Sequence, residues 1–238
     1  MTRRASLVFL LALAGCGSSG DPAVGSLRVL FIGNSLTYAN DLPAMVAGFA
    51  LEARVGLRIE VEDVSNANYA LEDHWGDSRT MRTLDEGGWD VVVLQQGPSS
   101  LPENQVNLRE NAARFAERIR QLGGTPALYM VWPDVTRLSF FDAVSQSYRN
   151  AAEAADAALY PAGEAWRAAW MVDPSLPLYD GDGYHPSILG TYLAALTIYH
   201  GLTSRSVIGL SSPDGVRADV AAMLQQAAEQ ATAQFGRR

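Results

Sequence analysis

The stretch LRVLFIG, at residues 27–33, decides the fold of this chain. It is short and apolar and ends at a glycine, which is typical of a strand buried in a parallel sheet. Comparable runs follow at residues 57–64, 89–95 and 127–132, with a shorter one near 159–160. The run at 89–95 gives the clearest strand prediction, because it is rich in β-branched residues.

Helical patterns separate these runs. Asp41 is a candidate N-cap for the first helix, and Pro186 stands where the first turn of the penultimate helix would begin. Strands that alternate with helices predict an α/β fold, namely a flavodoxin-like three-layer α/β/α sandwich around a mainly parallel five-stranded sheet. The expected helices cover residues 43–53, 71–84, 103–122, 142–158, a segment beginning at 186, and 214–235.

The N-terminal segment predicts export. Arg3 and Arg4 precede a short apolar run at residues 7–13, and small residues then lead to Cys16. This pattern predicts a secretory signal at residues 1–15, with an apolar run too short for a permanent membrane span. LAGC, at residues 13–16, also resembles the bacterial lipobox, in which the cysteine is acylated. An ordinary signal with an incidental cysteine is the alternative.

Residues 16–25 are rich in glycine and serine and predict a flexible tether, so that residues 26–238 form the single folded domain. We therefore expect secretion across the inner membrane and lipid anchoring through Cys16 at the bacterial cell envelope, on the periplasmic or outer-membrane face. The lipid is the only predicted contact with a membrane.

Composition excludes several functions. The net charge of −8 disfavours nucleic acid as a partner. All 18 basic residues are arginines, so neither a Schiff-base lysine nor a P-loop lysine is present. The single cysteine permits no internal disulfide. Three histidines that lie far apart give no zinc-like spacing, and we expect neither a metal nor another cofactor.

Two distant segments carry candidate catalytic residues. Ser35 follows the first predicted strand in FIGNSLT, and His185 follows Asp182 by three residues in DGYHP. A hydroxyl, an imidazole and a carboxylate are the nucleophile, base and orienting group that attack on an ester requires. Ser35 and Gln95 each lie just past a strand, and both should therefore reach the rim where parallel sheets bind ligands.

GNSLT, at residues 33–37, and DGYHP, at residues 182–186, together resemble the motifs of the SGNH (GDSL-type) hydrolase superfamily. The resemblance extends from about residue 27 to the last predicted helix. It implies an SGNH-hydrolase-like fold, with Ser35 as the nucleophile, His185 as the general base and Asp182 as the residue that orients it. The G-x-S-x-G elbow of α/β-hydrolases is absent from the sequence.

The resemblance also implies an oxyanion hole made of the serine N–H, a glycine N–H in a second block and an asparagine side chain in a third. The second block, SNANYAL, has no glycine, so that Ala67 or Asn68 would donate the N–H. The third block carries glutamine where asparagine is usual, with Gln95 the first candidate and Gln96 the second. His74, which follows the second block, is a candidate to face the pocket, and a packing role is its alternative.

These features predict a serine esterase that works through an acyl-enzyme on a small-molecule or glycan ester, including acyl groups on carbohydrate. A non-catalytic surface protein that binds carbohydrate or another ligand on the same fold is the alternative. A nucleotide-binding domain is disfavoured, because the first predicted strand ends at the single glycine Gly33 and is not followed by G-x-G-x-x-G. The sequence gives no prediction of the oligomeric state.

Overall fold

The computed structural model describes residues 25–53 and 56–237. Its centre is a parallel five-stranded sheet with strand order β2-β1-β3-β4-β5, which confirms the predicted α/β class. The strands are β1 (Gly25–Gly33), β2 (Leu57–Ser65), β3 (Val91–Leu94), β4 (Thr125–Tyr129) and β5 (Ala158–Tyr160).

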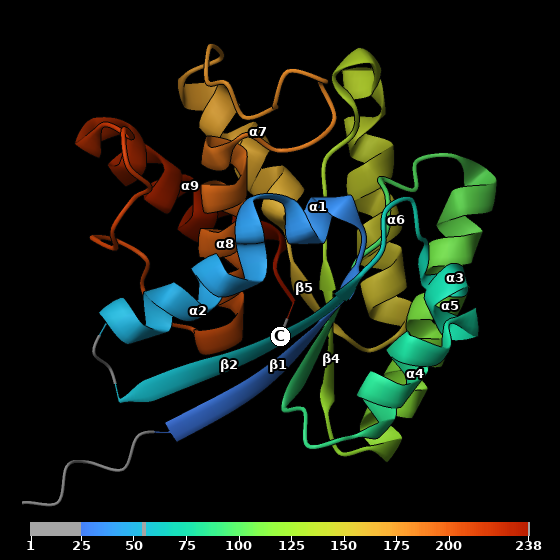
Figure 1. Cartoon of the computed structure of the whole chain (residues 1–238). Coiled ribbons are helices and arrows are strands. Elements are labelled where there is room, and N and C mark those ends of the chain that lie inside the picture. The colour runs from blue at the N-terminus through green and yellow to red at the C-terminus, as the bar shows by residue number, and fades with distance from the viewer. Residues whose placement is uncertain (1–24, 54–55, 238) are drawn as a thin grey trace, which may run out of the picture.

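Helices cover both faces of the sheet, which gives the predicted three layers (Figure 1). One face carries α2 (Leu42–Glu52), α7 (Ala162–Val172), α8 (Ile188–Thr203) and α9 (Ala218–Phe235). The other carries α3 (Leu71–Gly76), α4 (Ser78–Asp85), α5 (Pro102–Gln121) and α6 (Phe141–Ala154). The short helix α1 (Ser35–Tyr38) and two 3-10 turns, η1 (Ala39–Asp41) and η2 (Val135–Phe140), follow strand ends.

Burial explains why the sequence alone predicts the first strand. Residues 29–32 are fully buried, because helices cover both sides of the sheet at its centre. The predicted strand at 127–132 is shifted in the structure, where β4 begins at Thr125 and leaves the ladder after Tyr129. Residues 130–132 are as buried as the strand, so that hydrophobicity alone could not mark its end.

Several helix boundaries also differ from the prediction. The helix expected over 71–84 is broken at Asp77, whose carboxylate accepts a hydrogen bond from the Thr80 N–H and begins α4. The structure also contains α7, which the sequence analysis did not identify. Asp41 precedes α2 as expected, but its side chain caps no N–H, because its backbone is left-handed (φ 55°).

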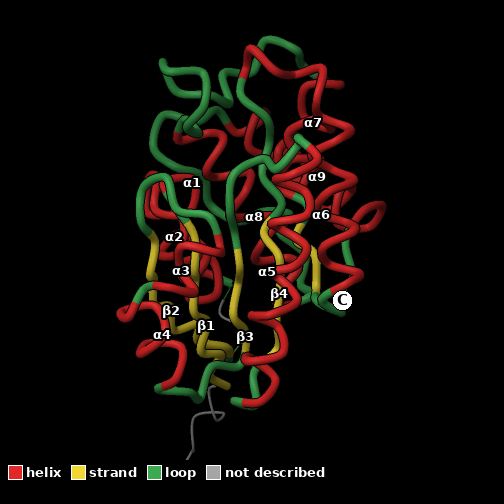
Figure 2. Tube along the Cα trace, turned by 90° about the vertical axis from the view of Figure 1, so that its right-hand side faces the viewer, coloured by secondary structure: helices red, strands yellow, loops and turns green. Residues whose placement is uncertain are grey.

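Strand register brings three segments to one edge of the sheet. Gly33 at the end of β1 pairs with Ser65 at the end of β2, and Ile32 pairs with Leu94 at the end of β3. Loops and turns gather beyond this end of the strands in Figure 2. The carboxyl edge is where ligands bind in open parallel sheets.

The predicted signal, Cys16 and most of the predicted tether lie outside the described residues. The predicted tether is one residue too long, because Gly25 is the first residue of β1. In the described part of the chain, no helix combines the length and the apolar character needed to cross a membrane.

Candidate active site

The end of β1 positions Ser35. After Gly33 the chain remains extended at Asn34, whose Oδ1 accepts a hydrogen bond from the Leu36 N–H at 3.1 Å and so caps α1. Ser35 is the first residue of that helix, where N–H groups lack intrahelical partners. No hydrogen bond within the described residues engages the Ser35 N–H.

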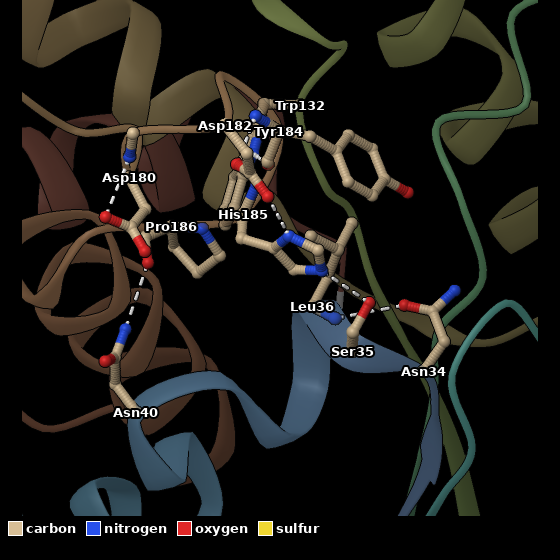
Figure 3. A network of polar contacts seen from close by, with 11 residues as sticks. Asn34, Ser35, Leu36, Asn40, Trp132, Asp180, Asp182, Tyr184, His185 and Pro186 are labelled. Atoms are coloured by element: carbon tan, nitrogen blue, oxygen red, sulfur yellow. Dashed lines mark hydrogen bonds and ion pairs between the residues drawn. The ribbon is translucent and has the colours of Figure 1, made fainter.

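The structure brings Ser35, His185 and Asp182 together (Figure 3). His185 Nε2 lies 2.8 Å from Ser35 Oγ, although 150 positions separate the two residues. His185 Nδ1 lies 2.5 Å from Asp182 Oδ2. A carboxylate only accepts hydrogen bonds, so Nδ1 carries the proton and Nε2 is free to accept from the serine hydroxyl. This is the order of contacts that the sequence motifs predicted.

Backbone contacts hold Asp182 in its loop. Its Oδ1 accepts hydrogen bonds at 2.9 Å from the N–H groups of Tyr184 and His185, while Oδ2 takes the imidazole proton. The hydrogen bond with His185, followed by those two N–H groups, lowers the pKa of Asp182 to about 2. Asp182 is therefore ionised at neutral pH, as an orienting carboxylate must be.

Asn40 joins the segment that follows α1 to the loop that carries His185. Its Nδ2 donates to the Pro186 carbonyl at 3.0 Å and to Thr191 Oγ1 at 2.9 Å. The first of these bonds is drawn in Figure 3. The Asn40 backbone is left-handed (φ 52°), a conformation that asparagine tolerates better than most residues. Asn40 is therefore a positioning residue for His185, and no sequence pattern predicts this role.

Asn40→Gly should lower kcat by about tenfold, because it removes the amide but permits the left-handed backbone. Loss of the two hydrogen bonds should destabilise the protein by about 1 kcal/mol. Ester hydrolysis and urea unfolding measure the two effects. Gly48→Ala, on the exposed side of α2, is a control that should leave hydrolysis unchanged. Wild-type kcat in Asn40→Gly would show that the loop of His185 needs no such support.

Gln95 supports the loop that carries Ser35. Its Oε1 accepts from the Asn34 N–H at 2.9 Å and from Thr37 Oγ1 at 2.7 Å, while its Nε2 donates to Asn34 Oδ1 and to the Gln96 carbonyl. The side chain is fully buried. The structure thus corrects the prediction that Gln95 donates to an oxyanion, because its longer arm folds back to satisfy a buried N–H and both amide hydrogens are already used.

Gln96 and His74 also face the interior. Gln96 accepts from the Leu71 N–H at 3.0 Å and donates to Ser99 Oγ at 2.8 Å, which again corrects its prediction as an oxyanion donor. His74 is fully buried, and its Nε2 donates to the Gly33 carbonyl at 2.7 Å. Burial lowers the pKa of His74, so that the ring is neutral. It is a support for the end of β1 and not a pocket residue.

Ala67 and Asn68 remain candidates to donate a backbone N–H to an oxyanion. Both lie in a turn closed by a 3.2 Å hydrogen bond from the Tyr69 N–H to the Asn66 carbonyl. Asn34 Nδ2 donates to the Tyr69 carbonyl at 3.0 Å, which holds the turn against the Ser35 loop. Asn68 has a φ of 64°, a conformation that favours glycine but that asparagine tolerates. No hydrogen bond in the described part of the chain uses either N–H.

Gly33 lies where a side chain has no room. A Cβ at this position would come within 2.3 Å of Thr37 Oγ1 and 2.6 Å of Gln95 Oε1. Both atoms are buried and already hydrogen-bonded to each other. The glycine that ends the first strand is thus required by a close approach of the supporting glutamine.

Gly33→Ala should destabilise the protein by about 2–3 kcal/mol, because overpacking of a dense core costs this much. Urea unfolding measures the change, and hydrolysis should fall with it as the Ser35 loop shifts. Gly48→Ala is the matched control, since a Cβ there meets nothing within 4 Å and alanine favours a helix. Equal stability of the two variants would contradict the close approach.

No group of His, Cys, Asp and Glu side chains among the described residues has an arrangement that could hold a metal ion.

A cavity of about 600 Å³ lies between α6, α7 and α9, and it contains none of the predicted site residues. A second cavity, of about 320 Å³, is lined by Tyr184, the neighbour of His185.

The layers, strand order and rim define the fold of the SGNH hydrolases, and this chain has that fold. A Slackia heliotrinireducens protein described as an SGNH hydrolase is 25% identical and covers 75% of this chain and 100% of its own, with a TM-score of 0.65. A DUF4886 family protein from Bacteroides uniformis is 19% identical and covers 87% of this chain and 95% of its own, with a TM-score of 0.71.

A variant of an acetyl xylan esterase from Geobacillus stearothermophilus is 16% identical and covers 76% of this chain and 97% of its own, with a TM-score of 0.60. No protein-family model and no curated protein matches this chain. The similar structures share the fold of this chain, and the 25% identical one is described as a hydrolase.

Proposed function

We propose that this protein is a serine esterase in which Ser35, His185 and Asp182 form the catalytic triad. The observation that carries the proposal is the continuous path from Ser35 Oγ through the imidazole to the Asp182 carboxylate, with contacts of 2.8 and 2.5 Å. The carboxyl edge of the sheet, where this path lies, is the usual place for a ligand. Hydrolysis of p-nitrophenyl acetate tests the proposal, and a folded protein that leaves this ester intact would oppose it.

The first half of the reaction forms an acyl-enzyme. His185 Nε2 takes the proton from Ser35 Oγ as that oxygen bonds to the ester carbonyl carbon, and the carbonyl oxygen takes up the negative charge. When the carbonyl reforms, the bond to the alcohol oxygen breaks and Nε2 returns the proton to that oxygen. The acyl group is then bonded to Ser35 and the alcohol is free. Asp182 stabilises the imidazolium while it exists.

The second half repeats these steps with water. His185 Nε2 takes a proton from water as the water oxygen bonds to the acyl carbon. Collapse of the intermediate breaks the bond to Ser35 Oγ, which regains a proton from Nε2, and the carboxylic acid is released. The N–H of Ser35 and an N–H from Asn68 or Ala67 are the proposed donors to the oxyanion. Two such donors offer a stabilisation of several kcal/mol, at about 3 kcal/mol for each.

We propose an ester of a carbohydrate or of another small alcohol as the substrate. An acetyl xylan esterase is among the structures that share the fold, which supports the acyl-carbohydrate option.

We also propose secretion and lipid anchoring at the cell envelope through Cys16, on the evidence of LAGC and the apolar run before it. After cell lysis, the Cys16→Ser form should no longer be found in the membrane fraction. A variant that stays in the membrane fraction as wild type does would contradict the anchor.

A further inference from the structure

The cavity of about 320 Å³ beside the triad has the size of a small ligand site. Its walls come from the segments that follow β3 and β4, and Tyr184 closes it toward the triad. The Tyr184 ring packs edge-on against the His185 imidazole, with ring centroids 5.2 Å apart. A ligand in this cavity would therefore lie next to the catalytic base.

Three hydrogen bonds fix this cavity relative to His185. The Val135 N–H donates to the Gly183 carbonyl at 2.9 Å, and Tyr179 Oη donates to the Pro133 carbonyl at 2.5 Å. Trp132 Nε1 donates to the Tyr184 carbonyl at 3.1 Å, as Figure 3 shows. The wall that follows β4 and the loop of the base are thus one connected structure, so that the cavity is formed before any ligand arrives.

The polar groups of the cavity retain hydrogen-bonding capacity. The Arg137 guanidinium makes no ion pair among the described residues. Its one hydrogen bond there is with Ser100 Oγ at 3.5 Å, and its Cζ lies 4.8 Å from the centroid of the Phe140 ring. The Asn104 side-chain amide and the Tyr184 hydroxyl line the cavity and make no hydrogen bond to another described residue. Asp134 accepts from the Thr136 N–H and hydroxyl through Oδ1, and its Oδ2 has no hydrogen-bond partner among the described residues. The cavity thus offers donors and acceptors together.

The polar groups of the cavity match three kinds of ligand to different degrees. A fatty acyl chain would remove water from them without replacing its hydrogen bonds, at about 1–3 kcal/mol for each buried group. A charged ligand gains no net attraction, because the charges of Arg137 and Asp134 oppose each other. A neutral molecule with several hydroxyls matches the set, since each hydroxyl both donates and accepts a hydrogen bond.

The position of the cavity indicates which half of the ester it would hold, namely the alcohol half. His185 Nε2 protonates the departing alcohol oxygen, so the alcohol must leave on the side of the imidazole. The candidate oxyanion donors, Ser35 and Asn68, follow β1 and β2, whereas the cavity follows β3 and β4. We propose that this cavity binds the alcohol half of the substrate and that this alcohol is a neutral sugar. The proposal rests on the esterase function proposed above.

Two substrates and one pair of arginine variants test the assignment in the full chain. Acetylated xylotriose carries hydroxyls on its alcohol half, and p-nitrophenyl acetate carries none. Arg137→Ala should lower kcat/KM for the sugar ester about tenfold more than for p-nitrophenyl acetate, since it removes charge-assisted hydrogen bonds. Arg58→Ala, an exposed arginine at the opposite end of the sheet, should leave the ratio of the two constants unchanged.

Binding of free xylotriose to the Ser35→Ala form gives a readout that needs no turnover. Chemical-shift titration should show saturable binding, weakened about tenfold by a second change of Arg137 to Ala. The sugar site would be overturned by undetectable binding of xylotriose or by an affinity that does not change when Arg137 is replaced. It would also be overturned if Arg137→Ala lowered kcat/KM equally for both esters. If wild type binds xylotriose but hydrolyses neither ester, the esterase function fails and the binding assignment stands.

Discussion

Ser35→Ala should lower kcat/KM for p-nitrophenyl acetate by at least about 10⁴-fold, the scale of losses when a triad member is removed. The reason is that alanine has no oxygen to bond to the carbonyl carbon, so only binding and oxyanion contacts remain. Stability should change little, because the Ser35 hydroxyl bonds His185 at the half-exposed rim and no core group. Initial rates at matched concentrations, with urea unfolding of both proteins, measure the two effects.

Ser78→Ala is the matched control for this change. Ser78 is an exposed residue at the start of α4 and should leave the rate unchanged when replaced. A rate for Ser35→Ala within a few-fold of wild type would remove Ser35 from the mechanism and leave the contact with His185 as a structural one.

Asp182→Asn should lower kcat by about 10²–10³-fold. An asparagine amide donates to Nδ1, which moves the imidazole proton to Nε2 and leaves no acceptor for the serine hydroxyl. A buried triad aspartate costs about 10⁴-fold on this change. The effect should be smaller here, because the Asp182 side chain is 52% exposed and water can partly take its place.

The fold of the Asp182→Asn form should remain intact. Asparagine keeps an Oδ1 that can accept from the N–H groups of Tyr184 and His185. The hydrogen bonds that lower the pKa of Asp182 stabilise the protein above the unfolded pKa of about 3.9 and are lost as the pH falls through about 2. The unfolding midpoints of wild type and variant should therefore differ slightly at pH 7, and this difference should shrink below about pH 4 and disappear only below about pH 2. Asp173→Asn, in a distant turn, is the control, and wild-type kcat in Asp182→Asn would contradict the orienting role.

The sequence was sufficient to predict the sheet and the contacts among Ser35, His185 and Asp182, for a physical reason. A parallel strand buried on both faces is an uninterrupted apolar run, so β1 and β3 were visible without any tertiary information. Strand ends of a parallel sheet share an edge, which brought Ser35 to a defined rim. The three-residue spacing of Asp182 and His185 is a local turn, and the structure shows the corresponding contact.

The support around the triad could not be predicted, because it depends on contacts between distant segments. The place of Gln95 after a strand suggests an oxyanion donor, but its Nε2 donates to Asn34 Oδ1, 61 positions away, and to the Gln96 carbonyl. His74 looked like a pocket residue for a similar reason, yet it donates to a carbonyl 41 positions away. Asn40 gave no signal, since its partner lies 146 positions along the chain.

Reaction with a fluorophosphonate tests the central claim most directly, because this reagent bonds to a serine oxygen only when a neighbouring base and an oxyanion site activate it. Mass spectrometry of the protein and of its peptides locates the adduct. We predict one adduct per chain, on Ser35, which is absent in Ser35→Ala and much slower to form in His185→Ala. A folded protein that forms no adduct, or carries it on another residue, would contradict a Ser35 nucleophile and favour a binding protein on the same fold.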